Sequence, residues 1–342
     1  MSVTYTIERA TRASRISAVT FVLLVGALAA APLWAGRSDM RLMAELYSYL
    51  ALASLWNLLA GYTGLVSVGQ QAFVGFGGYM LFALAMFFGV HPLAAIPLAG
   101  VLSVLVAAPV GALIFRLRGA YFAIGTWVVA EVFRLVFAQV QSLGGGSGIS
   151  LPIGVVKALA SSRDGREWTV YWLALALAVA VLLLVYWLLR SRPGLALTAI
   201  RDDETASQSV GIDIWRTKFM VYLATAGATG MIGALIFLQK LRISPDAAFS
   251  INDWTAYVIF ITVIGGIGRI EGPIVGTLVF FALRETLADL GTVYLLILGA
   301  VAIAIMLKAP KGLWGYIADR SGLELFPVRR RVVATGASEG TS

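Results

Sequence analysis

Two oppositely charged residues lie inside an otherwise apolar stretch of the sequence. Glu131 and Arg134 are three positions apart, a spacing that places both side chains on one face of a helix. Charged groups at membrane depth are costly, so they are usually paired or functional. Two interpretations stay open. The favoured one is a self-satisfied pair that anchors helix packing, and the other is a contribution to a path for a polar solute.

A second concentration of polar groups lies in residues 57–79, which read NLLAGYTGLVSVGQQAFVGFGGY. Backbone breaks at membrane depth are tolerated where the chain lines a cavity or is buried in protein. The segment predicts a broken helix along a permeation path, or a turn followed by a glycine face for tight helix packing, and both can hold. The candidates for a translocation path are Asn57, Ser67, Gln70 and Gln71, followed by Glu131 and Arg134.

The sequence offers little to an enzyme or a metal site. It has no cysteine and one histidine, His91, which excludes disulfides and argues against thiolate or imidazole metal sites. Residues 145–148 match the GxSG of intramembrane serine proteases, but those enzymes need a histidine downstream, and His91 lies upstream. The glycine-rich residues 265–273 lack a preceding strand, and no Gly-Lys dipeptide occurs, so no nucleotide-binding loop is expected. We expect no catalytic residue, no cofactor and no metal.

The elements that must position these residues are apolar helices. Of the 342 residues, 59% are hydrophobic and 13% are charged, about half the charged share of soluble domains. This composition predicts an all-α, polytopic membrane protein with about ten spans. The expected spans are residues 16–34, 42–60, 72–88, 92–115, 121–137, 170–189, 219–238, 254–267, 272–288 and 293–307. The first has the basic flank of a signal peptide but is long enough to cross about 30 Å of hydrocarbon, so we expect an uncleaved helix.

The distribution of basic residues predicts the orientation. With residues 1–15 in the cytoplasm, 17 Lys and Arg fall on the cytoplasmic side and 7 on the outside, as the positive-inside rule requires. Both termini are then cytoplasmic, residues 138–169 form an outside loop, and residues 190–218 form a cytoplasmic loop. The permease domain would cover residues 16–308. Residues 309–342 would form a basic cytoplasmic tail without regular structure.

The cytoplasmic loop at 190–218 is polar and predicts one short helix with both ends marked. Asp202 or Asp203 can cap its start, Glu204 lies in the first turn where the helix dipole favours an anion, and Gly211 follows as its stop. A membrane protein that exposes one capped helix is offering it to a partner. The candidate coupling residues are Asp202, Asp203, Glu204, Ala206 and Gly211.

Six segments in the same order resemble the permease subunits of branched-chain amino acid ABC importers of the LivM type. They are residues 57–79, 116–134 (RLRGAYFAIGTWVVAEVFR), 144–152 (GGGSGISLP), 191–218 (SRPGLALTAIRDDETASQSVGIDIWRTK), 265–278 (GGIGRIEGPIVGTL) and 308–315 (KAPKGLWG). The resemblance implies a permease in the bacterial inner membrane that takes up branched-chain or other small aliphatic amino acids.

The resemblance also implies partners. These are a second related permease, two cytoplasmic ATPase subunits that dock on residues 202–211, and a periplasmic substrate-binding protein, with the lipid bilayer around the spans and no nucleic acid. Many relatives of this family have histidine where Gln70 or Gln71 stands, so the exact ligand stays open if that position touches the substrate. Within the same family, urea or short amides are alternative substrates. The alternative from another class is an ion-coupled secondary transporter. It would need an unpaired carboxylate in the membrane, whereas Glu131 has Arg134 beside it.

Overall fold

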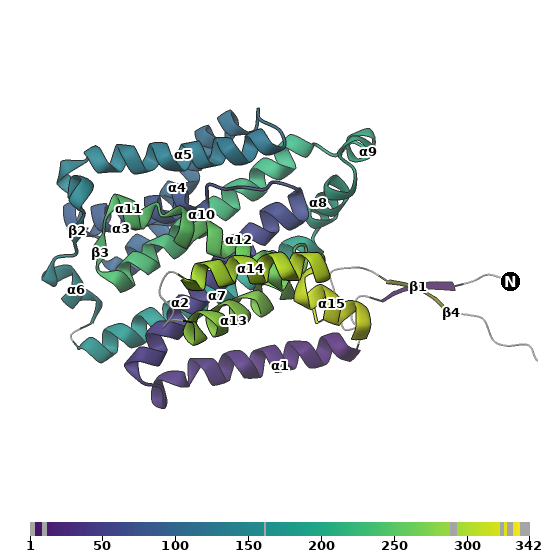
Figure 1. Cartoon of the computed structure of the whole chain (residues 1–342), viewed down its shortest axis with the longest axis horizontal. Coiled ribbons are helices and arrows are strands. Elements are labelled where there is room, and N and C mark those ends of the chain that lie inside the picture. The colour runs from purple at the N-terminus through teal and green to yellow at the C-terminus, as the bar shows by residue number, and fades with distance from the viewer. Residues whose placement is uncertain are drawn as a thin grey trace, which may run out of the picture.

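The computed structural model describes residues 4–8, 12–160, 162–287, 293–321, 325–326 and 331–335. These residues form a bundle of long helices (Figure 1). The α-helices are α1 (Arg12–Ala29), α2 (Arg37–Asn57), α3 (Gln70–Phe87), α4 (Pro92–Ile114), α5 (Ala120–Gln139), α6 (Ile153–Leu159), α7 (Arg163–Arg190), α8 (Arg192–Asp202), α9 (Glu204–Ser209), α10 (Ile214–Lys240), α11 (Pro245–Ala248), α12 (Tyr257–Gly265), α13 (Glu271–Thr286), α14 (Val293–Lys308) and α15 (Gly312–Ser321). The all-α prediction is confirmed.

Shorter elements complete the described chain. Two single turns of π-helix, η2 (Leu58–Tyr62) and η5 (Asn252–Ala256), extend α2 and precede α12, and three 3-10 turns are η1 (Ala31–Leu33), η3 (Gln141–Leu143) and η4 (Gly145–Ser147). Strand β1 (Thr4–Glu8) pairs with β4 (Arg331–Thr335), and β2 (Ile149–Ser150) pairs with β3 (Arg242–Ile243). Figure 1 shows β1 and β4 beyond the end of the bundle that carries α8, α9 and α15. Strands β1 and β4 therefore lie on the side of the predicted coupling loop.

Every predicted span coincides with a helix, but their lengths differ. In the described part of the chain, eight helical stretches are long and apolar enough to cross a membrane. The apolar part of the first segment is shorter, and α13 has 16 residues. A count of ten spans therefore stays a prediction.

The tail differs from its prediction. Residues 312–321 form α15 rather than irregular chain. Asp319 of α15 accepts from Arg269 at 2.8 Å and from Lys311 at 2.6 Å. The pair with Arg269 holds the helix against the turn between α12 and α13, a contact made across fifty residues that composition does not reveal, whereas the pair with Lys311 is local to α15.

The core of the bundle is built on α2, α3 and α10. Helix α10 packs along α3 and α4, while α2 packs along α7. The predicted glycine face of α3 is confirmed, because a Cβ atom on Gly77 would overlap the carbonyl oxygen of Gly230 in α10. Contacts of this kind let two helix backbones approach closely without a hydrophobic driving force from water. Helices α12 and α13 also meet through a glycine, because a Cβ atom on Gly276 would overlap the carbonyl oxygen of Ile261.

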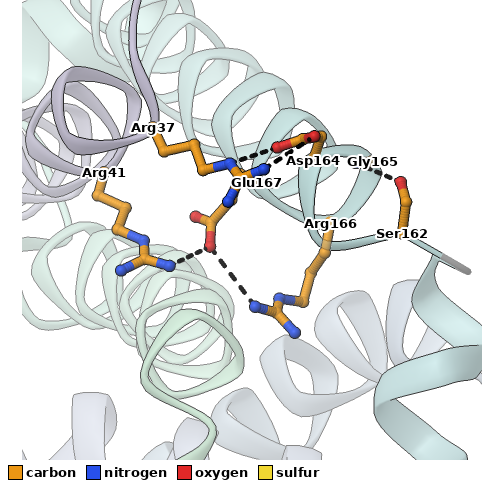
Figure 2. A network of polar contacts seen from close by, with 7 residues as sticks. All are labelled: Arg37, Arg41, Ser162, Asp164, Gly165, Arg166 and Glu167. Atoms are coloured by element: carbon orange, nitrogen blue, oxygen red, sulfur yellow. Dashed lines mark hydrogen bonds and ion pairs between the residues drawn. The ribbon is translucent and has the colours of Figure 1, made fainter.

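Ion pairs join the start of α2 to the start of α7. Glu167 accepts from Arg41 at 2.6 Å and lies 3.6 Å from Arg166, so one carboxylate faces two guanidinium groups (Figure 2). Beside it, Arg37 makes two hydrogen bonds to Asp164, the shorter at 2.5 Å. Glu167 is buried, whereas Arg37 and Asp164 are exposed. Water therefore screens the pair of Arg37 with Asp164 more than it screens the pair of Arg41 with Glu167.

Replacing Glu167 by glutamine should destabilise the contact between α2 and α7. The variant leaves two guanidinium groups without their shared carboxylate, so we expect a loss of about 1–2 kcal/mol in the free energy of unfolding. Thermal unfolding in mild detergent measures it. Asp164→Asn is the matched control, since its pair is exposed and should contribute less than about 1 kcal/mol. Equal effects of the two substitutions would contradict this assignment.

Candidate translocation path and coupling segment

A small cavity lies between α2, α3 and α10. Its volume is about 20 Å³, room for roughly one water molecule. The polar part of its wall comes from Ser67, Gln70, Thr225 and Thr229. The rest of the wall is formed by Leu55, Trp56, Leu59, Phe73, Tyr222 and Ala226. The cavity thus pairs a polar strip with an apolar wall, the combination that a small amphiphilic solute requires.

The break in the chain between η2 and α3 positions the polar strip. Residues 64–69 are not helical, and Gly64 there has a positive φ of 72°. Trp56 fixes this connection by donating its indole N–H to the carbonyl oxygen of Ser67 at 2.8 Å. The side chain of Thr126 in α5 accepts from the backbone N–H of Val68 at 3.0 Å. The predicted interruption of the helix is therefore real, and it places Ser67 and Gln70 together at the cavity.

Only one of the two polar groups of the Gln70 side chain has a hydrogen-bond partner in the described part of the chain. Its Nε2 donates to the carbonyl oxygen of Leu52 at 3.0 Å, while its buried Oε1 has no partner among the residues that the structure describes. Leaving a buried acceptor unpaired costs about 1–3 kcal/mol, so such a group points to a missing hydrogen-bond donor. A polar molecule that enters the cavity can supply that donor.

The other predicted path residues lie elsewhere. Gln71 is buried, and its Oε1 accepts from the hydroxyl of Thr255 in η5. Asn57 donates to the carbonyl oxygen of Arg269 at 2.8 Å and accepts from the N–H of Gly268 at 2.8 Å. It thereby clamps the end of α2 to the turn before α13. A part for Gln71 or Asn57 in a path stays a prediction.

Glu131 and Arg134 form the predicted pair, but on the exposed side of α5. Arg134 donates from Nη2 to Glu131 at 2.6 Å, and from Nη1 to Asp246 of α11 at 2.9 Å. Neither residue lines the cavity. Sequence reasoning missed Thr225 and Thr229, which do. Their spacing of four in the apolar segment 219–238 places both on one helix face and was the available signal.

The predicted cytoplasmic helix is α9, and both of its ends form as expected. Asp203, not Asp202, is the cap, since its carboxylate accepts from the backbone N–H of Ala206 at 2.9 Å. At the other end of α9, the backbone N–H of Gly211 donates to the carbonyl oxygen of Gln208 at 3.0 Å. The backbone N–H of Ile212 donates to the carbonyl oxygen of Ser207 at 3.1 Å. These two bonds, with Gly211 at φ 85°, form a Schellman motif. Asp202 instead ends α8, an additional helix that the prediction of one short helix lacked.

Two contacts tie this segment to the membrane helices. Glu204 of α9 forms an ion pair with Lys218, which is only 8% exposed in the second turn of α10. Arg201 of α8 donates to the carbonyl oxygen of Gly61 in η2 at 3.4 Å. The segment formed by α8 and α9 thus holds α10 through one contact and η2, at the end of α2, through the other. Both α2 and α10 contribute to the cavity wall.

The family described as branched-chain amino acid transport system / permease component matches residues 40–307. The chain belongs to that family. The match covers the cavity, α8, α9 and the helices from α2 to α13, whereas α1 and α15 lie outside it. The resemblance drawn from six short segments is confirmed.

Several named relatives of this branched-chain amino acid transport permease are similar over much of their length. The high-affinity branched-chain amino acid transport system permease protein LivM of Salmonella typhimurium is 30% identical over 81% of this chain and 70% of its own. Methanocaldococcus jannaschii has two relatives. Its probable permease LivM is 29% identical over 50% of this chain and 49% of its own, and its probable permease LivH is 22% identical over 80% and 90%. No solved structure matches the chain.

Proposed function

We propose that this permease imports branched-chain or other small aliphatic amino acids across a bacterial inner membrane at the expense of ATP. It would work with a second related permease, two cytoplasmic ATPase subunits and a periplasmic substrate-binding protein. The relatives support this proposal, because the Salmonella protein is named a high-affinity branched-chain amino acid transport permease. The chain itself would carry no catalytic residue and no cofactor.

The path would run through the cavity beside Gln70. At about 20 Å³ the cavity is far smaller than the roughly 300–1,000 Å³ of ordinary small-molecule sites. An amino acid therefore enters only after α2, α3 and α10 move apart. The unpaired Oε1 of Gln70 would accept a hydrogen bond from the solute's ammonium group, and Leu55, Leu59 and Phe73 would contact its apolar side chain.

Coupling would use the two contacts of the cytoplasmic segment. A partner ATPase that moves α9 would move α10 through Glu204 and Lys218, because the buried ammonium group ties the two helices together. Helix α8 would act on the end of α2 through Arg201 and Gly61. The two inputs would reach two different helices that line one cavity, and alternating access would need these helices to move relative to each other.

The observation that carries this proposal is the buried, unpaired oxygen of Gln70, and replacing Gln70 tests it. We expect Gln70→Leu to lower the rate of leucine uptake into vesicles by about tenfold or more, the effect of one lost buried hydrogen bond. Assembly with the ATPase subunits should not change, since Gln70 lies within the bundle. Gln139→Leu, at the exposed end of α5, is the matched control.

Three results would redirect the proposal. Unchanged uptake by Gln70→Leu would remove this residue from the path. Uptake that survives ATP depletion but collapses with the ion gradient would favour a secondary transporter. Competition by urea or short amides, with none by leucine, would change the substrate.

A further inference from the structure

Helix α5 runs along one edge of the bundle and leaves one face uncovered (Figure 1). Exposed side chains recur along it at intervals of three and four residues, the spacing of one helix face. They include Ile124, Val128, Glu131 and Leu135. A charged residue therefore stands in the middle of an otherwise apolar, unpartnered stripe.

The depth of Glu131 makes its exposure costly. It lies eight residues before the end of α5 at Gln139, which is about 12 Å along the helix. Its side chain is 46% exposed, and Asp246, with which it shares Arg134, is 82% exposed. Two carboxylates thus share one guanidinium group, and the cluster is net negative when all three groups are ionised.

Three other helices that are uncovered in the described part of the chain, α4, α7 and α14, present no such group at this depth. Helix α4 contains no charged residue, and α14 has only its last residue, Lys308. Helix α7 confines its charged residues to its first five positions and its last. The exposed side chains of these helices at mid-membrane depth are apolar and suit lipid. Hydrocarbon against Glu131 would instead meet a carboxylate that is hydrogen-bonded to Arg134 on one side and unsolvated on its exposed side.

We propose that the Ile124–Val128–Glu131–Leu135 face of α5 is the surface that binds the second, related permease chain. The proposal rests on the importer function above and adds to it which face of the chain the partner covers. The net negative cluster requires a polar or basic side chain from the partner opposite Glu131. A distinct chain rather than a second copy is indicated, because Methanocaldococcus jannaschii carries permeases of both the LivM and the LivH kind that resemble this one.

Photo-cross-linking in the native membrane tests this surface. A benzoylphenylalanine residue is placed at Val128, which is 52% exposed on α5, or at Leu105, which is 63% exposed on α4 and serves as the matched control. Leu135 provides a second site on the same stripe in case the first variant does not assemble. After illumination, adducts are separated by mass and identified by mass spectrometry, and leucine uptake is measured in the same vesicles.

We expect an adduct with a different permease chain at Val128 and Leu135 and none at Leu105. Adducts only with lipid at the two α5 sites, an adduct with the partner at Leu105 instead, or an adduct with a second copy of this chain would each overturn the assignment. A different result would contradict the proposed function itself, namely an active, co-purified complex that contains no second permease. The proposed function stands if that chain is present but cross-links through another helix.

Discussion

Replacing Lys218 by methionine should disconnect ATP hydrolysis from uptake. Methionine keeps the apolar stem of the side chain and its packing, but it removes the ammonium group that binds Glu204. Motion of α9 then no longer pulls α10. We expect uptake to fall by about tenfold or more, the range of ordinary coupling free energies between sites. ATPase subunits should still co-purify, and their hydrolysis should continue without transport.

Two variants separate loss of coupling from loss of structure. Lys218→Arg keeps the cation and should retain most of the uptake. The double variant Glu204→Lys with Lys218→Glu restores an ion pair of reversed sign and should recover uptake relative to either single change. Full transport by Lys218→Met would show that α9 does not act on α10 through this pair.

Replacing Gly77 by valine should disrupt the bundle itself. A Cβ atom there would overlap the backbone of Gly230, which, unlike a flexible side chain, cannot turn away. Forcing extra atoms into a packed contact costs about 1–3 kcal/mol, and here α3 and α10 must separate along the core contact of the molecule. We expect a large loss of monodisperse protein in size-exclusion chromatography of detergent extracts.

Gly299→Val is the matched control for this change. Gly299 also lies in the middle of a helix, α14, but nothing lies within 4 Å of an added Cβ. Its variant should extract and elute as the parent protein does. Similar losses for the two variants would mean that valine in a helix, not the contact between α3 and α10, causes the defect.

Features set by neighbours in the sequence could be predicted. The cap at Asp203, the stop at Gly211 and the pair of Glu131 with Arg134 each depend on residues no more than a few positions apart. The length of the apolar stretches likewise predicted where the helices lie. The glycines of residues 57–79 indicated the close packing of α3, which the structure shows against α10. In each of these cases, residues close together in the sequence were enough to predict the structure.

Features that join distant segments could not be predicted. Asn57 binds a turn 211 residues away, and Arg201 reaches a carbonyl oxygen 140 residues away. Both look like ordinary polar residues in the sequence. Asp246, the third member of the α5 cluster, is 112 positions from Arg134. The cavity wall also combines α2, α3 and α10. The spacing of Thr225 and Thr229 predicts one shared helix face, but their place at the cavity depends on how those helices pack.

The tether between α9 and α10 acts near one end of a long, rigid rod. From Lys218 to Lys240 that rod extends about 33 Å, and a tilt of about 5° about its inner end swings the outer end by about 3 Å. The chain leaving that end of α10 is β3, which pairs with β2 of the predicted outside loop through Ile243 and Ile149. Since about 3 Å is the length of a hydrogen bond, a tilt of α10 by that amount would be enough to open the pairing of β3 with β2 at the other end of the helix.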